Sequence, residues 1–384
     1  LSGISVKDVD AGSAPMSMVL RVEHGVLTLL GAAGAVSVQG AGSNEITLVG
    51  SLDDLNSLLN GNLHYEPAKD FWGEDNLTIT TSDRGNTGVG GALTDTTQVG
   101  ITVTAEADAP QLGLGTHDIH ALQGAWVPLN LSASVVNPAP GELSVRIQNL
   151  DGAQVVDEHG QSVGHADNNG DWLLPMEHSV PLYVKDLAAG DHSLILTAES
   201  SAGGSTLSSA EETLTIHSQS GHDLVGSDRG DWLFGSTGSD RILGGLGDDV
   251  IRGGQGNDIL SGGAGSDLFV WGQGDEGTAT QPAIDTVTDF HPEEGDKIDL
   301  ADLLKGVTDN SVDGLLGHLS ASVTTGSAGL SDVNLSVSPA GDGQVTQQIT
   351  LKGVDLSGWN LSGSSSHDIL QSMLDQHSLI IQHP

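Results

Sequence analysis

Short apolar runs alternate with turns of Gly, Asn and Asp along the first 217 residues. In the first 110 residues the β-rich runs lie at 17–21, 26–30, 76–80 and 97–103. Between residues 111 and 217 they lie at 143–147, 173–175, 193–197 and 212–216. Short strands at this spacing are typical of antiparallel sandwiches. We predict a mainly β chain that starts with two tandem β-sandwich modules, 1–110 and 111–217.

A period of nine replaces this pattern from Gly226 onward. Five nonapeptides stand in register: GSDRGDWLF, GSTGSDRIL, GGLGDDVIR, GGQGNDILS and GGAGSDLFV. The sixth position is always Asp: Asp231, Asp240, Asp249, Asp258 and Asp267. The eighth is always apolar: Leu233, Ile242, Ile251, Leu260 and Phe269. A flexible glycine-rich linker would not keep Asp and an apolar residue in phase over five periods.

Each position of the nonapeptide has a physical role. Glycines such as Gly235, Gly244 and Gly253 let the backbone turn tightly, so that its carbonyl oxygens can face an ion. The Asp carboxylate completes the cage, and the apolar side chain enters a core shared by successive turns. Calcium fits because it accepts about six to eight oxygen ligands in flexible geometry. We predict a right-handed parallel β-roll over 218–275 that binds several Ca²⁺ ions through these Asp and Gly residues.

Both flanks of the repeat depart from the pattern. Arg229 replaces Gly at the fourth place of the first repeat, and His222 stands where an upstream Asp would be. Asp267 ends the series, with no further turn expected after it. We predict that the first turn caps the roll as an incomplete site and that Asp267 binds weakly.

A mixed segment, 276–384, follows the repeat. It contains an amphipathic stretch at 298–304, strand-like runs at 333–337 and 347–351, and a predicted helix at 366–376. Taken alone, this segment predicts a small α+β cap on the roll.

Composition narrows the possible partners. Twelve basic against 51 acidic residues give a net charge of −39, which disfavours nucleic acid and anionic membranes. The chain has no cysteine, no apolar run long enough to span a membrane and no signal-peptide pattern in its first thirty residues. Without calcium, neighbouring Asp residues repel, so we expect the roll to fold only when the ion binds.

Other candidate sites are weaker. Residues 160–164 match G-x-S-x-G but lack the strand and helix that a catalytic serine needs, so we expect no enzyme activity. Asp8, Asp10 and Asp108 have the spacing of calcium ligands at module junctions, although turn-forming Asp is the simpler interpretation of each. Trp126, Trp172 and Tyr183 could line a groove, but core packing is the simpler interpretation.

Several segments resemble known families. The nonapeptides are similar to the RTX (repeats-in-toxin) calcium-binding family. LHYEPAKDFWGEDNLTITTSD, residues 63–83, and AEADAP, residues 105–110, resemble the cadherin-like repeats and linkers of giant bacterial adhesins, while residues 111–217 look like immunoglobulin-like repeats. Residues 267–306, and QQITLKGVDL at 347–356, resemble the C-terminal target domain of type I secretion substrates.

These resemblances imply a calcium-dependent adhesin of the bacterial cell surface, of which this chain is the distal part. It would be exported by a type I ABC transporter complex, fold in extracellular calcium as a monomer, and attach cells to a host or surface ligand in biofilm formation. Since the first residue is Leu within a strand-like pattern, we expect a piece of a longer protein. The alternatives are the RTX part of a secreted enzyme or toxin whose active domain lies upstream, and a spacer that binds no ligand.

Overall fold

The computed structural model describes residues 1–9, 11–31, 33–85, 91–136, 142–176, 181–309, 311–325, 330–359, 361 and 365–383. Strands far outnumber helices in them, which confirms the prediction of a mainly β chain. The chain forms two compact units. Unit 1 contains residues 1–109, 135–142 and 200–207, and unit 2 contains residues 110–134, 143–199 and 208–384.

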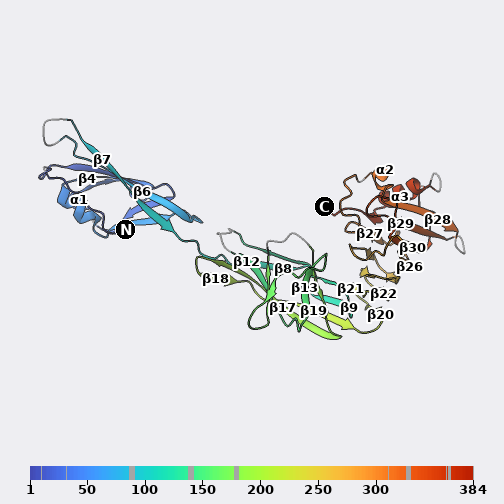
Figure 1. The fold of residues 1–384 in the computed structure, drawn as a ribbon. Coiled ribbons are helices and arrows are strands. Elements are labelled where there is room, and N and C mark those ends of the chain that lie inside the picture. Colours follow the sequence, from blue (N-terminus) through green and yellow to red (C-terminus); the bar gives the residue numbers. More distant parts are fainter. Residues whose placement is uncertain are drawn as a thin grey trace. The chain divides into compact units, whose positions relative to one another are not determined.

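Unit 1 is built on a five-stranded antiparallel sheet (Figure 1). Its order is β3 (Ser37–Gln39), β4 (Glu45–Gly50), β1 (Met16–Arg21), β6 (Gly73–Ser82) and β7 (Thr94–Val103). Strands β2 (Gly25–Leu29) and β5 (Leu63–Pro67) form a second sheet. Alternate residues of β1 and β4 are buried, as the period-two pattern predicts. The pattern did not predict helix α1 (Leu52–Leu59), which Ser51 caps and which buries Leu55, Leu58 and Leu59.

Unit 2 begins with a sandwich of short strands. Its largest sheet has the order β14 (His165–Ala166), β15 (Trp172–Pro175), β12 (Glu142–Gln148), β17 (Gly190–Ala202), β19 (Glu212–Gln219) and β9 (Asp118–Leu122). A second sheet has the order β10 (Val127–Pro128), β16 (Leu182–Lys185) and β13 (Gln154–Asp157), and β8 (Gln111–Leu114) pairs with β11 (Leu131–Ser134). Strand β18 (Ser205–Ser208) lies mostly in residues 200–207, which belong to unit 1. The predicted runs at 143–147, 173–175, 193–197 and 212–216 fall in β12, β15, β17 and β19. A core that includes Ile119, Val145, Val155, Leu194 and Ile216 lies between the sheets.

The nonapeptides form a β-roll of two parallel sheets. Strands β20 (Asp223–Val225), β22 (Arg241–Leu246), β24 (Ile259–Ala264) and β26 (Ala283–Val287) belong to one sheet. Strands β21 (Trp232–Phe234), β23 (Val250–Arg252), β25 (Leu268–Val270) and β27 (Lys297–Asp299) belong to the other. Strand β21 also pairs in parallel with β9, so this sheet runs on from the sandwich into the roll.

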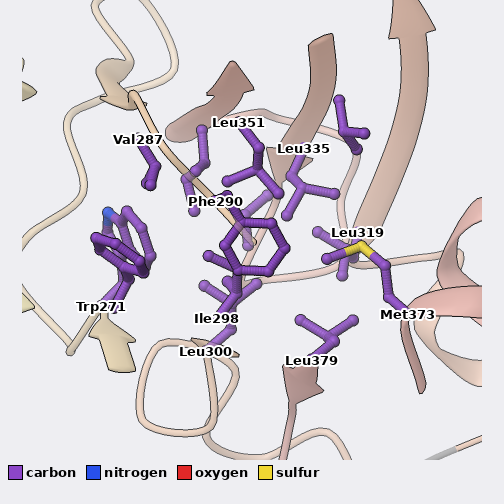
Figure 2. Close-up of a cluster of buried hydrophobic side chains, with 14 of the residues drawn as sticks. Trp271, Val287, Phe290, Ile298, Leu300, Leu319, Leu335, Leu351, Met373 and Leu379 are labelled. Carbon is purple, nitrogen blue, oxygen red and sulfur yellow. The ribbon is translucent and has the colours of Figure 1, made fainter. Parts of the chain in front are cut away.

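The roll and the mixed C-terminal segment share one hydrophobic core. The segment adds α2 (Val312–Leu315), β28 (Leu319–Thr325), β29 (Ser331–Val337), β30 (Gln347–Val354), α3 (Ser366–Asp375) and β31 (Leu379–Ile380). Strand β30 pairs with β26 and β31 with β27, so each roll sheet ends on a strand of this segment. Figure 2 shows Trp271, Phe290, Leu335 and Met373 in the same buried cluster. The C-terminal segment therefore continues the two sheets of the roll.

None of the three helices found in the described ranges is long and apolar enough to cross a membrane.

Candidate calcium site

The apolar positions of the nonapeptides hold the glycine-aspartate loops in place. Leu233, Ile242, Ile251, Leu260 and Phe269 are fully buried between the two sheets of the roll. Because each side chain fixes its strand, the preceding loop lies at the edge of the roll, in line with the loop two repeats later. The predicted role of the eighth position is confirmed.

The sixth-position aspartates form two ladders of hydrogen bonds. The backbone N–H of Asp231 donates to Oδ1 of Asp249 at 2.8 Å, and that of Asp249 donates to Oδ1 of Asp267 at 2.9 Å. On the other edge, the N–H of Asp240 donates to Oδ1 of Asp258 at 2.9 Å. The carboxylates of Asp249, Asp258 and Asp267 therefore each use one oxygen to accept a hydrogen bond from the turn two repeats before.

The second oxygen of three aspartates is left without a partner. Oδ2 of Asp249, Asp258 and Asp267 is buried and accepts no hydrogen bond from any described residue. Burying a carboxylate oxygen unpaired is costly, so such a group favours a cation or water as its partner. Oxygens of this kind on both edges of the roll fit Ca²⁺, a hard cation that prefers oxygen ligands.

Glycine at the first position makes room for these oxygens. A Cβ on Gly244 would collide with Oδ2 of Asp249 and with the carbonyl oxygen of Gly262. A Cβ on Gly253 would meet Oδ2 of Asp258, and one on Gly235 would meet the carbonyl oxygen of Gly253. The predicted Gly and Asp residues thus lie together, and carboxylate and carbonyl oxygens stand where a side chain at these glycines would lie.

The raised pKa values of the ladder aspartates also favour a bound cation. Burial raises the pKa of Asp249 to about 7 and that of Asp258 to about 8, and the charges of neighbouring aspartates add to the effect. The pKa of Asp267 is raised for the same reason. A bound dication would favour the ionised form of each group.

In the first two turns, the Asp carboxylate oxygens have hydrogen-bond partners within the protein. Oδ2 of Asp231 accepts the N–H of Ser227 at 2.5 Å. Oδ2 of Asp240 accepts the N–H of Ser236 at 2.6 Å, and its Oδ1 lies 2.7 Å from Nδ1 of His222. Serine stands in these repeats at the second place, where the later repeats have glycine. The two turns therefore differ from those of Asp249, Asp258 and Asp267.

The ladder does not end at Asp267, and the expectation that no turn follows it is wrong. The N–H of Asp267 donates to Oδ1 of Asp296 at 2.9 Å, and the N–H of Asp258 donates to Oδ1 of Asp285 at 2.8 Å. Burial raises the pKa of both Asp285 and Asp296 to about 6. Asp289 adds a third carboxylate, which accepts the N–H groups of Gly262 and Gly263. Strands β26 and β27 supply these turns from beyond the recognisable repeat.

Sequence analysis missed these three aspartates because long insertions break the period of nine. A signal was present: Asp285 and Val287, and likewise Asp296 and Ile298, keep the spacing of the sixth and eighth positions.

The remaining candidates stay apart from this site. Oδ1 of Asp8 accepts the N–H of Ala11 at 3.0 Å, the geometry of a local turn. Across the described parts of the chain, neither Asp8 nor Asp108 belongs to a group of three possible His, Asp or Glu metal ligands. Asp10 lies outside the described residues. Residues 160–164 lie between β13 and β14, with no helix following.

The three aromatic residues lie at or near the sandwich core. Tyr183 is buried, with the Arg252 guanidinium 5.5 Å from its ring centroid. Trp172 donates Nε1–H to the carbonyl oxygen of Val163 at 2.8 Å and packs against the core. Trp126 lies 5.9 Å from the Tyr183 ring, between centroids.

A family model of the RTX calcium-binding nonapeptide repeat matches residues 225–260 and 234–269. These are RTX repeats, and they bind calcium ions. Such repeats are typical of secreted proteins. The match leaves the rest of the chain unassigned.

Three similar solved structures show distant likenesses. A subunit of the Azotobacter vinelandii mannuronan C5-epimerase is 25% identical over 35% of this chain and 87% of its own, with a TM-score of 0.25. Mouse cadherin-23 EC22-24 is 13% identical over 51% of this chain and 53% of its own, with a TM-score of 0.23. The C-terminal domain of the Streptococcus agalactiae AgI/II polypeptide BspA is 13% identical over 56% of this chain and 88% of its own, also at 0.23. No curated protein sequence matches the chain.

Proposed function

We propose that this chain is the distal part of a bacterial surface adhesin that is exported by a type I secretion system and stabilised by calcium outside the cell. The observation that carries the proposal is the pair of Asp ladders, with three buried carboxylate oxygens unpartnered among the described residues. Because these oxygens need a cation, folding of the roll depends on calcium, which is scarce in the cytosol and plentiful outside.

The shared core extends this dependence to the C-terminal segment. Asp285 and Asp296 are rungs of the ladders, and Val287 and Ile298 beside them belong to the cluster that also contains Leu379. A chain without calcium therefore lacks a folded end, which suits export through a transporter that handles unfolded protein. In this proposal the segment also carries the signal for the type I ABC transporter complex.

The adhesive role rests on a different feature, the β-sandwich modules that precede the roll. Strand β9 of the second sandwich pairs with β21, so the roll holds one strand of this module in place through backbone hydrogen bonds. We propose that the sandwiches present a contact surface to a host or surface ligand and that the chain acts as a monomer without enzyme activity.

Binding of the full chain to cells tests the adhesive role. Fluorescent beads coated with the protein should attach to candidate host cells in calcium and detach in chelator. Beads coated with a variant carrying Asp249→Asn, Asp258→Asn and Asp267→Asn should attach less at the same calcium concentration. A spacer, or the RTX end of an enzyme, would give beads that attach in neither condition, and that result would overturn the proposal.

A further inference from the structure

A second group of possible metal ligands lies on the sandwich, beside the first turn of the roll, and shares no residue with the Asp ladders. His120 of β9 and His217 of β19 are directly opposite each other in a parallel strand pair. Asp118 precedes His120 by two residues and so shares its face, while Ile119 and Ile216 point into the core. One nitrogen of each histidine and one carboxylate oxygen of Asp118 all lie within 4.8 Å of one another.

The contacts of His217 are those of an oriented ligand. Its Nε2 lies 3.2 Å from Oδ1 of Asp118, and its Nδ1 lies 2.7 Å from Oδ1 of Asp191 on β17. An imidazole whose far nitrogen binds a carboxylate is held in one orientation, an arrangement common around metal-binding histidines. Asp191 therefore fixes the ring, and Nε2 faces the group.

The hydrogen bonding of the His120 ring is incomplete among the described residues. Its Nδ1 is buried and has no hydrogen-bond partner among the described residues. Its Nε2 lies 3.8 Å from Oδ1 of Asp231, beyond hydrogen-bond range. The ring stacks on that of His217, with centroids 4.8 Å apart. The two rings are therefore held face to face, with one nitrogen of each near a carboxylate oxygen of Asp118.

We propose that His120, His217 and Asp118 form a binding site for a divalent transition-metal ion of the Zn²⁺ class. Two imidazoles and one carboxylate suit such an ion, whereas Ca²⁺ prefers oxygen ligands alone. Three protein ligands leave one position of a tetrahedral ion for water. Asp191 is the positioning residue of this site.

The site would tie the sandwich to the start of the roll. It spans β9 and β19, and β9 is the strand that pairs with β21. Asp231, in the satisfied first turn, lies next to His120. The proposal is independent of the adhesive role, because it concerns a different metal and different residues.

Zinc titration of the full chain in saturating calcium tests the site. Isothermal titration calorimetry should show one tight Zn²⁺ site that excess calcium does not displace. His120→Gln and His217→Gln should each weaken it at least tenfold, and Asp191→Asn by about tenfold as an outer partner. His159→Gln, which changes an exposed histidine outside the group, is the matched control and should leave the affinity unchanged.

Cobalt gives an independent readout. Co²⁺ bound in a tetrahedral site should produce a visible absorption band that zinc abolishes and that His217→Gln removes. Far-ultraviolet circular dichroism in calcium checks that each variant folds. If a histidine variant does not fold, Asp118→Asn, which changes an exposed ligand, is tested in its place. Zinc affinity that is the same in the His120→Gln/His217→Gln double variant as in the parent, or no zinc binding by the parent, would overturn the proposal and leave a purely structural His–Asp network.

Discussion

Asp258 and Asp285 are 27 residues apart, yet the N–H of the first donates to Oδ1 of the second at 2.8 Å, as the N–H of Asp249 does to Asp267 across 18 residues. The ladder therefore follows the geometry of the roll rather than the spacing of the sequence. Insertions between turns lie outside the ladder, so the hydrogen-bond pattern survives where the repeat itself is no longer visible.

Removing one unpartnered carboxylate should weaken calcium binding. Asp258→Asn keeps the shape of the side chain and its Oδ1 but removes the negative charge, so we expect the calcium concentration at the folding midpoint to rise several-fold. Circular dichroism during a calcium titration measures it. Asp228→Asn, which changes an exposed Asp in the first loop, is the control and should not move the midpoint. Equal midpoints for both variants would contradict the assigned role of Asp258.

A methyl group at the ladder glycine should destabilise the calcium-bound roll. Gly244→Ala places a Cβ against Oδ2 of Asp249 and the carbonyl oxygen of Gly262. We expect a loss of about 1–3 kcal/mol in the free energy of unfolding, as for other overpacked sites. Thermal unfolding in saturating calcium measures the loss. Gly317→Ala, where a Cβ meets nothing within 4 Å, should have a much smaller effect.

A cavity in the C-terminal segment should impair folding of the repeats. Phe290 is 1% exposed and lies 6.4 Å from Phe269 of the fifth repeat, between ring centroids. Phe290→Ala should cost about 3–5 kcal/mol and raise the calcium concentration needed to fold the roll. Leu316→Ala, at a 39% exposed position of the same segment, is the comparison. If calcium-induced folding were unchanged in the Phe290 variant, the repeats and the segment would be separate folding units.

Stability should depend on pH in opposite directions with and without calcium. The pKa of Asp249 is about 7 and that of Asp258 about 8 in the folded chain, against the ordinary value of 3.8. Groups with a raised pKa bind more protons when folded, so the calcium-free roll loses stability as the pH rises from about 4 to about 8. With calcium the affinity should instead rise over that window, because protons and the ion compete for the same oxygens.

Two series of circular dichroism spectra check this prediction. In metal-free buffer the β signal should grow as the pH falls from about 8 to about 5. In calcium the folding midpoint should move to higher calcium concentration over the same change. The same direction in both series would show that the ladder carboxylates do not control folding.

Sequence alone predicted the elements whose pattern is local. Ile242 and Ile251 are buried because the period of nine places each at the same point of a turn. Asp285 and Asp296 were missed because the insertions before them hide their register. The group of His120 and His217 could not be predicted, because it depends on β9 pairing with β19, strands far apart in the sequence. Helix α1 was missed because Leu55, Leu58 and Leu59 lie in a short segment between strands.

Strand pairs within the repeats and strand pairs at the ends of the roll differ in how far apart along the chain the partners lie. Leu233 pairs with Ile251, only two repeats away, whereas Ile298 pairs with Leu379 and Ala283 with Gln347. Closing short loops costs little entropy and is fast, while long loops close slowly. We therefore expect the repeats to assemble turn by turn in the first moments of folding, and the long-range pairings of β30, β31 and β9 with the roll to form more slowly.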